Sequence, residues 1–227
     1  KRLARHPSVK LEAAMGSANS EPRRLPALNR IWGAPVVPLG LDVLVSHPGN
    51  HMGDLESGIR RNADAITEAL ERVPGTCVIA MEATSGSGTS IGSRFEELAA
   101  HIEHVPAAHR DRMGVCADTC HLYSAGHDLV EDFDGVWQRF DDVVGLDRLR
   151  ALHLNDSKTK FGSRRDRHEL IGEGSLGAAP FRRIMTDERF ARIPKVIETP
   201  KLEETVTDRR MLRRLRSYAR VARKSRP

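Results

Sequence analysis

The sequence of 227 residues has few cysteines and no long apolar run. Cys77, Cys116 and Cys120 are too few, and odd in number, for a disulfide framework, which favours a reducing compartment such as the cytoplasm. No segment approaches the roughly 18 consecutive apolar residues of a membrane-spanning helix, so we expect no membrane partner. The basic first residues are not followed by an apolar segment with a cleavage site, so no signal peptide is readable.

Composition and charge are those of a water-soluble globular protein. Hydrophobic residues make up 39% of the chain and charged residues 30%, and the length allows one large domain or two small ones. A net charge of +5 is compatible with a nucleic-acid partner but does not establish one.

Five short apolar segments each end in a residue that can bind a metal ion. The segments are LDVLVSH, CVIAME, MGVCAD, LRALH and PKVIE, and they end at His47, Glu82, Asp118, His153 and Glu198. Successive ends are about 35 residues apart, except for the last interval of about 45. This spacing is typical of a repeated strand, loop and helix. We therefore expect a strand to precede each of these residues.

Segments with helical periodicity separate the apolar segments. They cover residues 54–73, residues 93–105, where Ser93 and Glu96 are spaced as a capping box, and a stretch around 136–144. Strands that alternate with helices pair in parallel through right-handed crossovers. The predicted fold is an α/β fold with a parallel, barrel-type sheet of which five strands are readable. In such barrels the strand ends converge on one mouth, which would place all five residues in one site.

The stretch FGSRRDRHELIGEGSLG places Asp166 and His168 two positions apart among Arg164, Arg165 and Arg167. In an extended segment residues two apart share a face, so Asp166 and His168 can bind one ion while Arg167 points away. A solvated charged loop is the alternative. One histidine with these two residues would form a second set of three ligands, with positions open for water or substrate. Zinc suits such sets best, and manganese or iron would also accept them.

Five motifs together resemble the endonuclease IV family of apurinic/apyrimidinic endonucleases. They are HPGNH, MEATSGSG, GVCADTCHLYSAGHDL, HLNDSKTKFGSRRDRHELIGEGSLG and VIETP, within a match from about Leu41 to about Leu215. The resemblance implies an α/β, TIM-type (β/α)8 barrel with a trinuclear zinc cluster. About five of the eight strands are readable here, so we expect the barrel to be incomplete. It further implies a monomeric enzyme of base-excision repair that cleaves double-stranded DNA 5′ to abasic sites and leaves 3′-hydroxyl ends.

The resemblance also implies roles for individual residues. Glu82 would bridge two metal ions, His47 would bind one of them, and Glu82, Asp118 and Glu198 would be catalytic. The remaining metal ligands would be His153 beside Asp118 and Glu198, and His121, Asp166 and His168 on the third ion. Arg164, Arg165 and Arg167 would contact DNA phosphates, and Arg167 matches the family motif best.

Residues 1–40 depart from the family pattern. We expect an atypical segment there, altered or disordered, followed by a partial barrel over 41–227. No residue matches a family histidine that would share the metal ion of His47. We therefore keep three alternatives. In the first the chain binds fewer than three zinc ions, in the second it is an inactive fragment of such an enzyme, and in the third it is a metal-dependent barrel sugar isomerase or epimerase.

Three further features have simpler interpretations. Residues 208–227 favour a last barrel helix with a basic face over a DNA-binding tail. The glycines of TSGSGTSIG favour a loop entering a helix over a phosphate-binding loop. His101, His104 and His109 lie away from the strand ends, and we expect them on the surface.

Overall fold

A computed structural model describes residues 41–224, so the expectation for residues 1–40 lies outside the part described. In chain order the elements are β1 (Val43–Ser46), α2 (Leu55–Arg72), β2 (Val78–Glu82), α3 (Phe95–His104), η2 (Ala107–Arg112), β3 (Met113–Asp118), α4 (Thr119–Ala125), α5 (Phe133–Val143), η3 (Leu146–Arg148), β4 (Leu149–His153), β5 (Asp156–Ser157), β6 (His168–Glu169), α6 (Ala179–Thr186), η4 (Glu188–Phe190), β7 (Lys195–Val196) and α7 (Glu204–Lys224). The elements labelled η are 3-10 helices.

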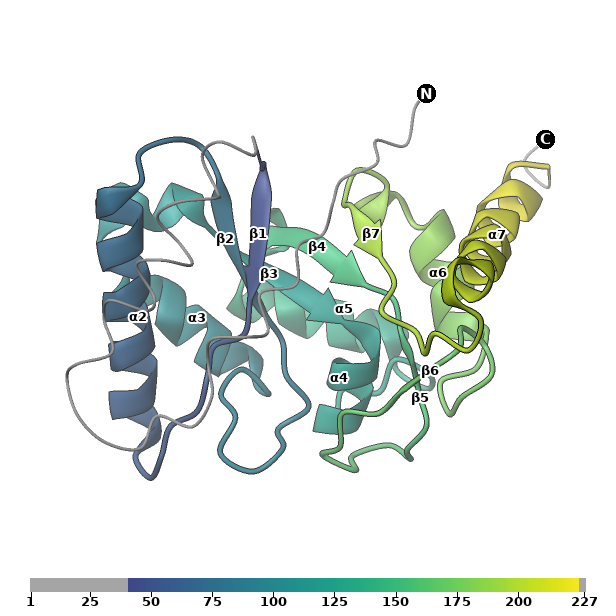
Figure 1. The fold of residues 1–227 in the computed structure, drawn as a ribbon, viewed down its shortest axis with the longest axis horizontal. Coiled ribbons are helices and arrows are strands. Elements are labelled where there is room, and N and C mark those ends of the chain that lie inside the picture. Colours follow the sequence, from purple (N-terminus) through teal and green to yellow (C-terminus); the bar gives the residue numbers. More distant parts are fainter. Residues whose placement is uncertain (1–40, 225–227) are drawn as a thin grey trace.

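The five strands predicted from the apolar segments form one parallel sheet in the order β1-β2-β3-β4-β7. The sheet is curled, and the helices lie along its outer face (Figure 1), so it forms part of a barrel wall as the spacing predicted. Each predicted strand ends at its candidate metal ligand or one or two residues before it. The short antiparallel pair β5 and β6 stands between β4 and α6, and this insertion accounts for the longer last interval.

The helices agree with the periodicity, with one correction at the start of α3. The predicted helix 54–73 is α2, whose N-cap Asp54 accepts a hydrogen bond from the Ser57 amide at 2.7 Å. The predicted capping box of Ser93 and Glu96 is absent, because α3 begins at Phe95. The buried Glu97 carboxylate accepts hydrogen bonds from the amides of Gly92 at 2.7 Å and Ser93 at 3.1 Å instead.

The two faces of the sheet carry different residues. The outer face and the helices bury a large apolar cluster that includes Phe95, Trp137 and Phe140. The concave face carries Ala80, Cys116 and Ala151, with Val43 and Val45 partly buried beside them. Residues two apart in a strand share a face, so the concave face also receives the side chains at the strand ends.

His101 corrects another expectation, because it is fully buried and not on the surface. It lies on the face of α3 that carries Leu98 and Ile102 toward the core, and its Nδ1 is 2.8 Å from the Glu97 carbonyl. His104 is exposed, as predicted.

The helix predicted near the C-terminus is α7, which buries Met211 and Leu215 beside α6. Within residues 41–224 no helix combines the length and hydropathy that crossing a membrane requires.

Candidate metal centre

Glu82, the last residue of β2, lies at the centre of the strand-end residues. Its side chain is buried, with Oε1 2.8 Å from His153 Nδ1 and Oε2 3.2 Å from His47 Nε2. One oxygen therefore faces His153, the last residue of β4, and the other faces His47, which directly follows β1. This arrangement suits a carboxylate that bridges two cations.

Asp118 ends β3 and is fully buried. Its Oδ1 accepts a hydrogen bond from the His121 amide at 3.0 Å, which makes Asp118 the N-cap of α4. Its Oδ2 accepts a hydrogen bond from Asn155 Nδ2 at 2.6 Å, and the Glu198 amide donates to Asn155 Oδ1 at 2.8 Å. Asn155 thus holds the ends of β3 and β7 together. Sequence reasoning missed it, although it follows His153 closely in the HLND motif.

Donor atoms of Glu82, Asp118, His153 and Glu198 all lie within 4.8 Å of one another. We call this group the strand-end cluster. It unites residues from β2, β3 and β4 and from the segment after β7, far apart in the sequence. Imidazole and carboxylate groups at this spacing are a ligand set for a divalent cation.

A second group, the loop cluster, consists of His121, Asp166 and His168. His121 Nε2 is 3.2 Å from Asp166 Oδ2, and His168 Nε2 is 3.1 Å from Asp166 Oδ1. Asp118 borders it, since donor atoms of Asp118, His121 and His168 also lie within 4.8 Å of one another. The structure therefore brings together the three residues that the sequence assigned to a second set.

Hydrogen bonds to the backbone orient both histidines of the loop cluster. His121 Nδ1 is 2.9 Å from the Ala83 carbonyl, and His168 Nδ1 is 3.1 Å from the Glu198 carbonyl. A carbonyl only accepts, so each Nδ1 carries the hydrogen and each Nε2 lone pair faces the carboxylates. Both Nε2 atoms are buried without a hydrogen bond among the described residues. Two oriented lone pairs beside poorly aligned carboxylates fit a metal ion.

His47 is placed less securely than the other predicted ligands. Its side chain is 48% exposed, and its contact with Glu82 is the one ion pair recorded for it in the described chain. No candidate ligand group of three or more within 41–224 includes it. Within the described residues, His47 therefore has Glu82 as its neighbouring candidate ligand.

The centre has a strongly anionic character. Burial favours a higher pKa for Glu82, but hydrogen bonds from His153 and His47 hold that pKa well below its usual value. Burial lowers the pKa of His121, yet the carboxylates of Asp118 and Asp166 raise it to about 10. The imidazoles of His121 and His168 beside Asp166 lower its own pKa. Cations, whether protons or metal ions, are therefore strongly attracted here.

Two free cysteines border the clusters. Cys116 and Cys120 are buried, and burial raises the pKa of each thiol to about 12. Donor atoms of Cys116 lie within 4.8 Å of those of Glu82 and His153, and Cys120 has the same relation to Asp166 and His168.

The arginines of the β5–β6 loop are all exposed, and within 41–224 none has a recorded ion pair. These are Arg164, Arg165 and Arg167. The Arg164 amide donates to the Ser124 carbonyl at 2.9 Å, and Arg167 Nη1 donates to the Asp166 carbonyl at 2.7 Å. Their charge is thus available beside the loop cluster.

Asp156, at the start of the same hairpin, holds the following loop. Its carboxylate accepts hydrogen bonds from the amides of Ser157, Gly172, Gly174 and Leu176 at 2.8–3.0 Å. A Cβ at Gly174 would lie 2.4 Å from the Ser157 carbonyl, so this position requires glycine. Asp156 is a second residue that sequence reasoning missed, because its partners in the loop lie 16 or more residues away.

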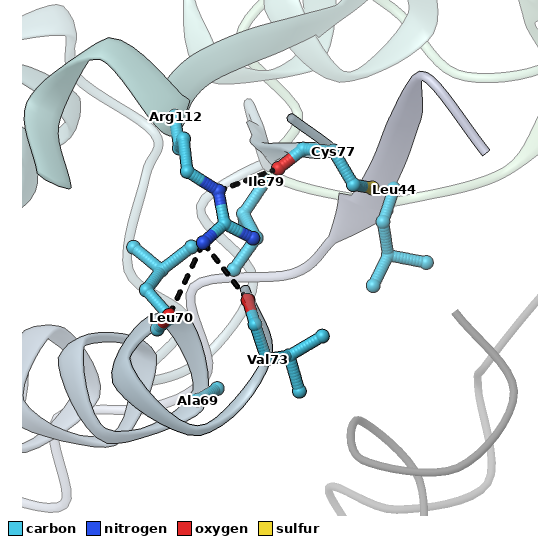
Figure 2. A pocket seen from close by; sticks show the side chains of 7 residues that line it. All are labelled: Leu44, Ala69, Leu70, Val73, Cys77, Ile79 and Arg112. Carbon is cyan, nitrogen blue, oxygen red and sulfur yellow. Dashed lines mark hydrogen bonds between the residues drawn. The ribbon is translucent and has the colours of Figure 1, made fainter. Parts of the chain in front are cut away.

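A small apolar pocket lies elsewhere, between the end of α2 and strands β1 and β2 (Figure 2). Arg112 projects into it, but its guanidinium donates to the carbonyls of Cys77, Leu70 and Val73 at 2.9–3.2 Å. This arginine fastens η2 to α2 and β2.

A curled parallel sheet with carboxylates and imidazoles at the carboxyl ends of its strands defines the class of metal-binding α/β barrels. The xylose isomerase-like TIM barrel family model matches residues 36–215, and the chain belongs to that family.

Several known proteins are similar to this chain over most of its length. Proteins named "Probable endonuclease 4" from Chloroflexus aggregans and Geobacter sulfurreducens are 46% and 48% identical over 187 and 186 residues. The alignments cover 81% and 80% of this chain but 65% and 62% of the relatives. The crystal structure of endonuclease IV from Thermus thermophilus superposes with a TM-score of 0.70 at 36% identity, over 82% of this chain and 64% of that one. The resemblance to endonuclease IV read from the motifs is thereby confirmed.

Proposed function

We propose that the chain is a metal-dependent nuclease that cleaves double-stranded DNA 5′ to abasic sites and leaves 3′-hydroxyl ends. The main support is the convergence of carboxylates and histidines from five strand ends, helix α4 and one hairpin on a single anionic site. The names of the relatives supply the reaction class. The chain spans less than two thirds of the length of these relatives.

Zinc is the metal that this donor set favours, with manganese as the second candidate. The strand-end cluster would hold one ion, the loop cluster a second, and Glu82 with His47 a third. Bound zinc would neutralise charge on the phosphate oxygens and provide an activated water.

The residues of the chain prepare the site before any substrate arrives. Hydrogen bonds from His153 and His47 fix both oxygens of Glu82, and Asn155 fixes Asp118 beside Glu198. The catalytic roles proposed for Glu82, Asp118 and Glu198 rest on this orientation. Fixed groups need not reorganise when charge develops on the phosphate.

The exposed arginines of the β5–β6 loop are proposed to bind DNA. Arg164, Arg165 and Arg167 carry fixed positive charge beside Asp166, where a phosphodiester in the site would lie. Arginine binds phosphate through paired hydrogen bonds as well as charge. On this proposal, metal ligands and cations alternate in the RRDRH segment because the substrate is a phosphodiester.

Cleavage of a duplex with one stable abasic-site analogue tests the proposal. We expect a single nick on the 5′ side, a 3′ end that a DNA polymerase extends, and no cut in the undamaged duplex. A chelator, or Glu82→Gln in the same assay, should abolish the nick. A folded, zinc-loaded chain that leaves the lesion intact would contradict the proposal.

The rival reaction, isomerisation or epimerisation of a sugar, is tested on the same preparation. A small sugar gives the exposed arginines no role, so Arg167→Gln should leave a sugar reaction unchanged but weaken nicking. The proposal also takes the chain to be a monomer in the cytoplasm, which light scattering and cell fractionation would check.

A further inference from the structure

The layer of side chains beneath the strand-end cluster contains one thiol. Ala80, Cys116 and Ala151 pack together on the concave face, two positions before Glu82, Asp118 and His153. The alanines offer no ligand atom. Cys116 is therefore the member of this layer that can bond to an ion held at the strand ends.

The position of Cys116 is set by the sheet register. Its Cα is paired with that of Glu82 across β2 and β3 and with that of Ala151 across β3 and β4. Donor atoms of Glu82, Cys116 and His153 lie within 4.8 Å of one another, and all three residues are buried. The group is fixed by neighbouring strands and does not depend on a loop.

Two ligand sets thus share Glu82 and His153. The set proposed for zinc completes them with the carboxylates of Asp118 and Glu198, and the other completes them with a thiol. Carboxylates favour hard cations, and thiolates favour soft ones. The sets differ in position as well as chemistry, because Cys116 lies level with Glu82 and two positions before Asp118 on β3.

We infer that Glu82, Cys116 and His153 form a coordination set for a soft divalent cation such as Cd²⁺. As the sulfur–cadmium bond forms, the thiol proton is released to solvent, so the charge on the site rises by one for each ion bound. A cadmium ion held there contacts Cys116 and lies farther from Asp118 and Glu198 than a zinc ion would. The inference concerns metal binding and holds whether or not the chain cleaves DNA.

The test uses the full chain with Cys116 as its sole thiol, made by Cys77→Ala and Cys120→Ala. After metal removal with a chelator, Cd²⁺ is titrated while the ultraviolet charge-transfer absorption of cadmium thiolate is recorded. We expect the absorption to saturate at one thiolate per chain. Adding Cys116→Ala should abolish the absorption and weaken cadmium binding by about 10- to 100-fold, with zinc binding affected less.

Asp118→Asn is the matched variant of the other ligand set. It should weaken zinc binding while the cadmium absorption of the sole-thiol protein remains. If the sole-thiol protein does not fold by circular dichroism, the single variants decide: Cys116→Ala loses one thiolate from the absorption and Cys120→Ala keeps that of Cys116. A folded protein that binds Cd²⁺ without absorption from Cys116 would overturn the inference.

Discussion

The strand-end cluster and the loop cluster hold similar ligands in different ways. Glu82, Asp118 and His153 are the last residues of neighbouring parallel strands, so sheet register sets their spacing. His121 and His168 are oriented by single hydrogen bonds to backbone carbonyls, and Asp166 is 49% exposed on a hairpin loop. We infer that the first cluster is the more rigid and the second the more easily lost.

The largest expected effect comes from Glu82→Gln. This change removes the carboxylate shared by His153 and His47, and metal affinity of the strand-end cluster should fall by more than about 100-fold, beyond the usual effect of an outer-shell residue. Competition with a chromophoric chelator measures it. The exposed Glu96→Gln on α3 is the control, and equal affinities in the two variants would argue against a bridging role.

Asp166→Asn should break the loop cluster selectively. The side chain that faces both Nε2 atoms loses its charge, so one ion per chain should be lost while the strand-end cluster keeps its ion. Native mass spectrometry counts the ions, with the exposed Asp111→Asn as control. Loss of every ion at once would mean that the two clusters are not separate sites.

Asn155→Ala should weaken the strand-end cluster without removing a ligand. The change leaves the Asp118 carboxylate and the Glu198 amide without their link, and we expect zinc affinity to fall by about 10- to 100-fold. The exposed Gln138→Ala is the control. An unchanged affinity would show that the sheet alone fixes these ligands.

Asp156→Asn should loosen the support of the loop cluster. An amide group would face one pair of backbone donors, and the free energy of unfolding should fall by about 2–3 kcal/mol. Hydrogen exchange should speed up at Gly172 and Gly174, compared with the exposed Asp142→Asn. Unchanged exchange there would contradict the anchoring role.

The smallest expected effect concerns His101, which is buried on α3. Burial lowers the pKa of His101 from its usual 6.5, so its share of stability is present above pH 6.5 and is lost as the pH falls below that value. His101→Asn should reduce the stability lost between pH 7.5 and 5.5 by about 1 kcal/mol. Urea unfolding of metal-free protein measures this.

Much of the site could be predicted from the sequence, because strand ends of a parallel sheet meet at one edge. Glu82, Asp118 and His153 needed only the spacing of the apolar segments. Asn155 and Asp156 could not be assigned in this way, since their partners are set by tertiary contacts that no local period records. The capping box failed because Glu97, one residue beyond Glu96, accepts the hydrogen bond of the Ser93 amide that the box assigns to Glu96.

Asp118 has a consequence for the order in which the chain folds. It ends β3, caps α4 through the His121 amide and borders both clusters. Asp118 and His121 are three residues apart, so their contact closes a very short loop at low entropic cost. Two of the three candidate ligands Asp118, His121 and His168 can therefore lie side by side in the nascent chain before β2, β3 and β4 have paired. A zinc ion captured at that stage would act as an early template for the fold as well as its final occupant.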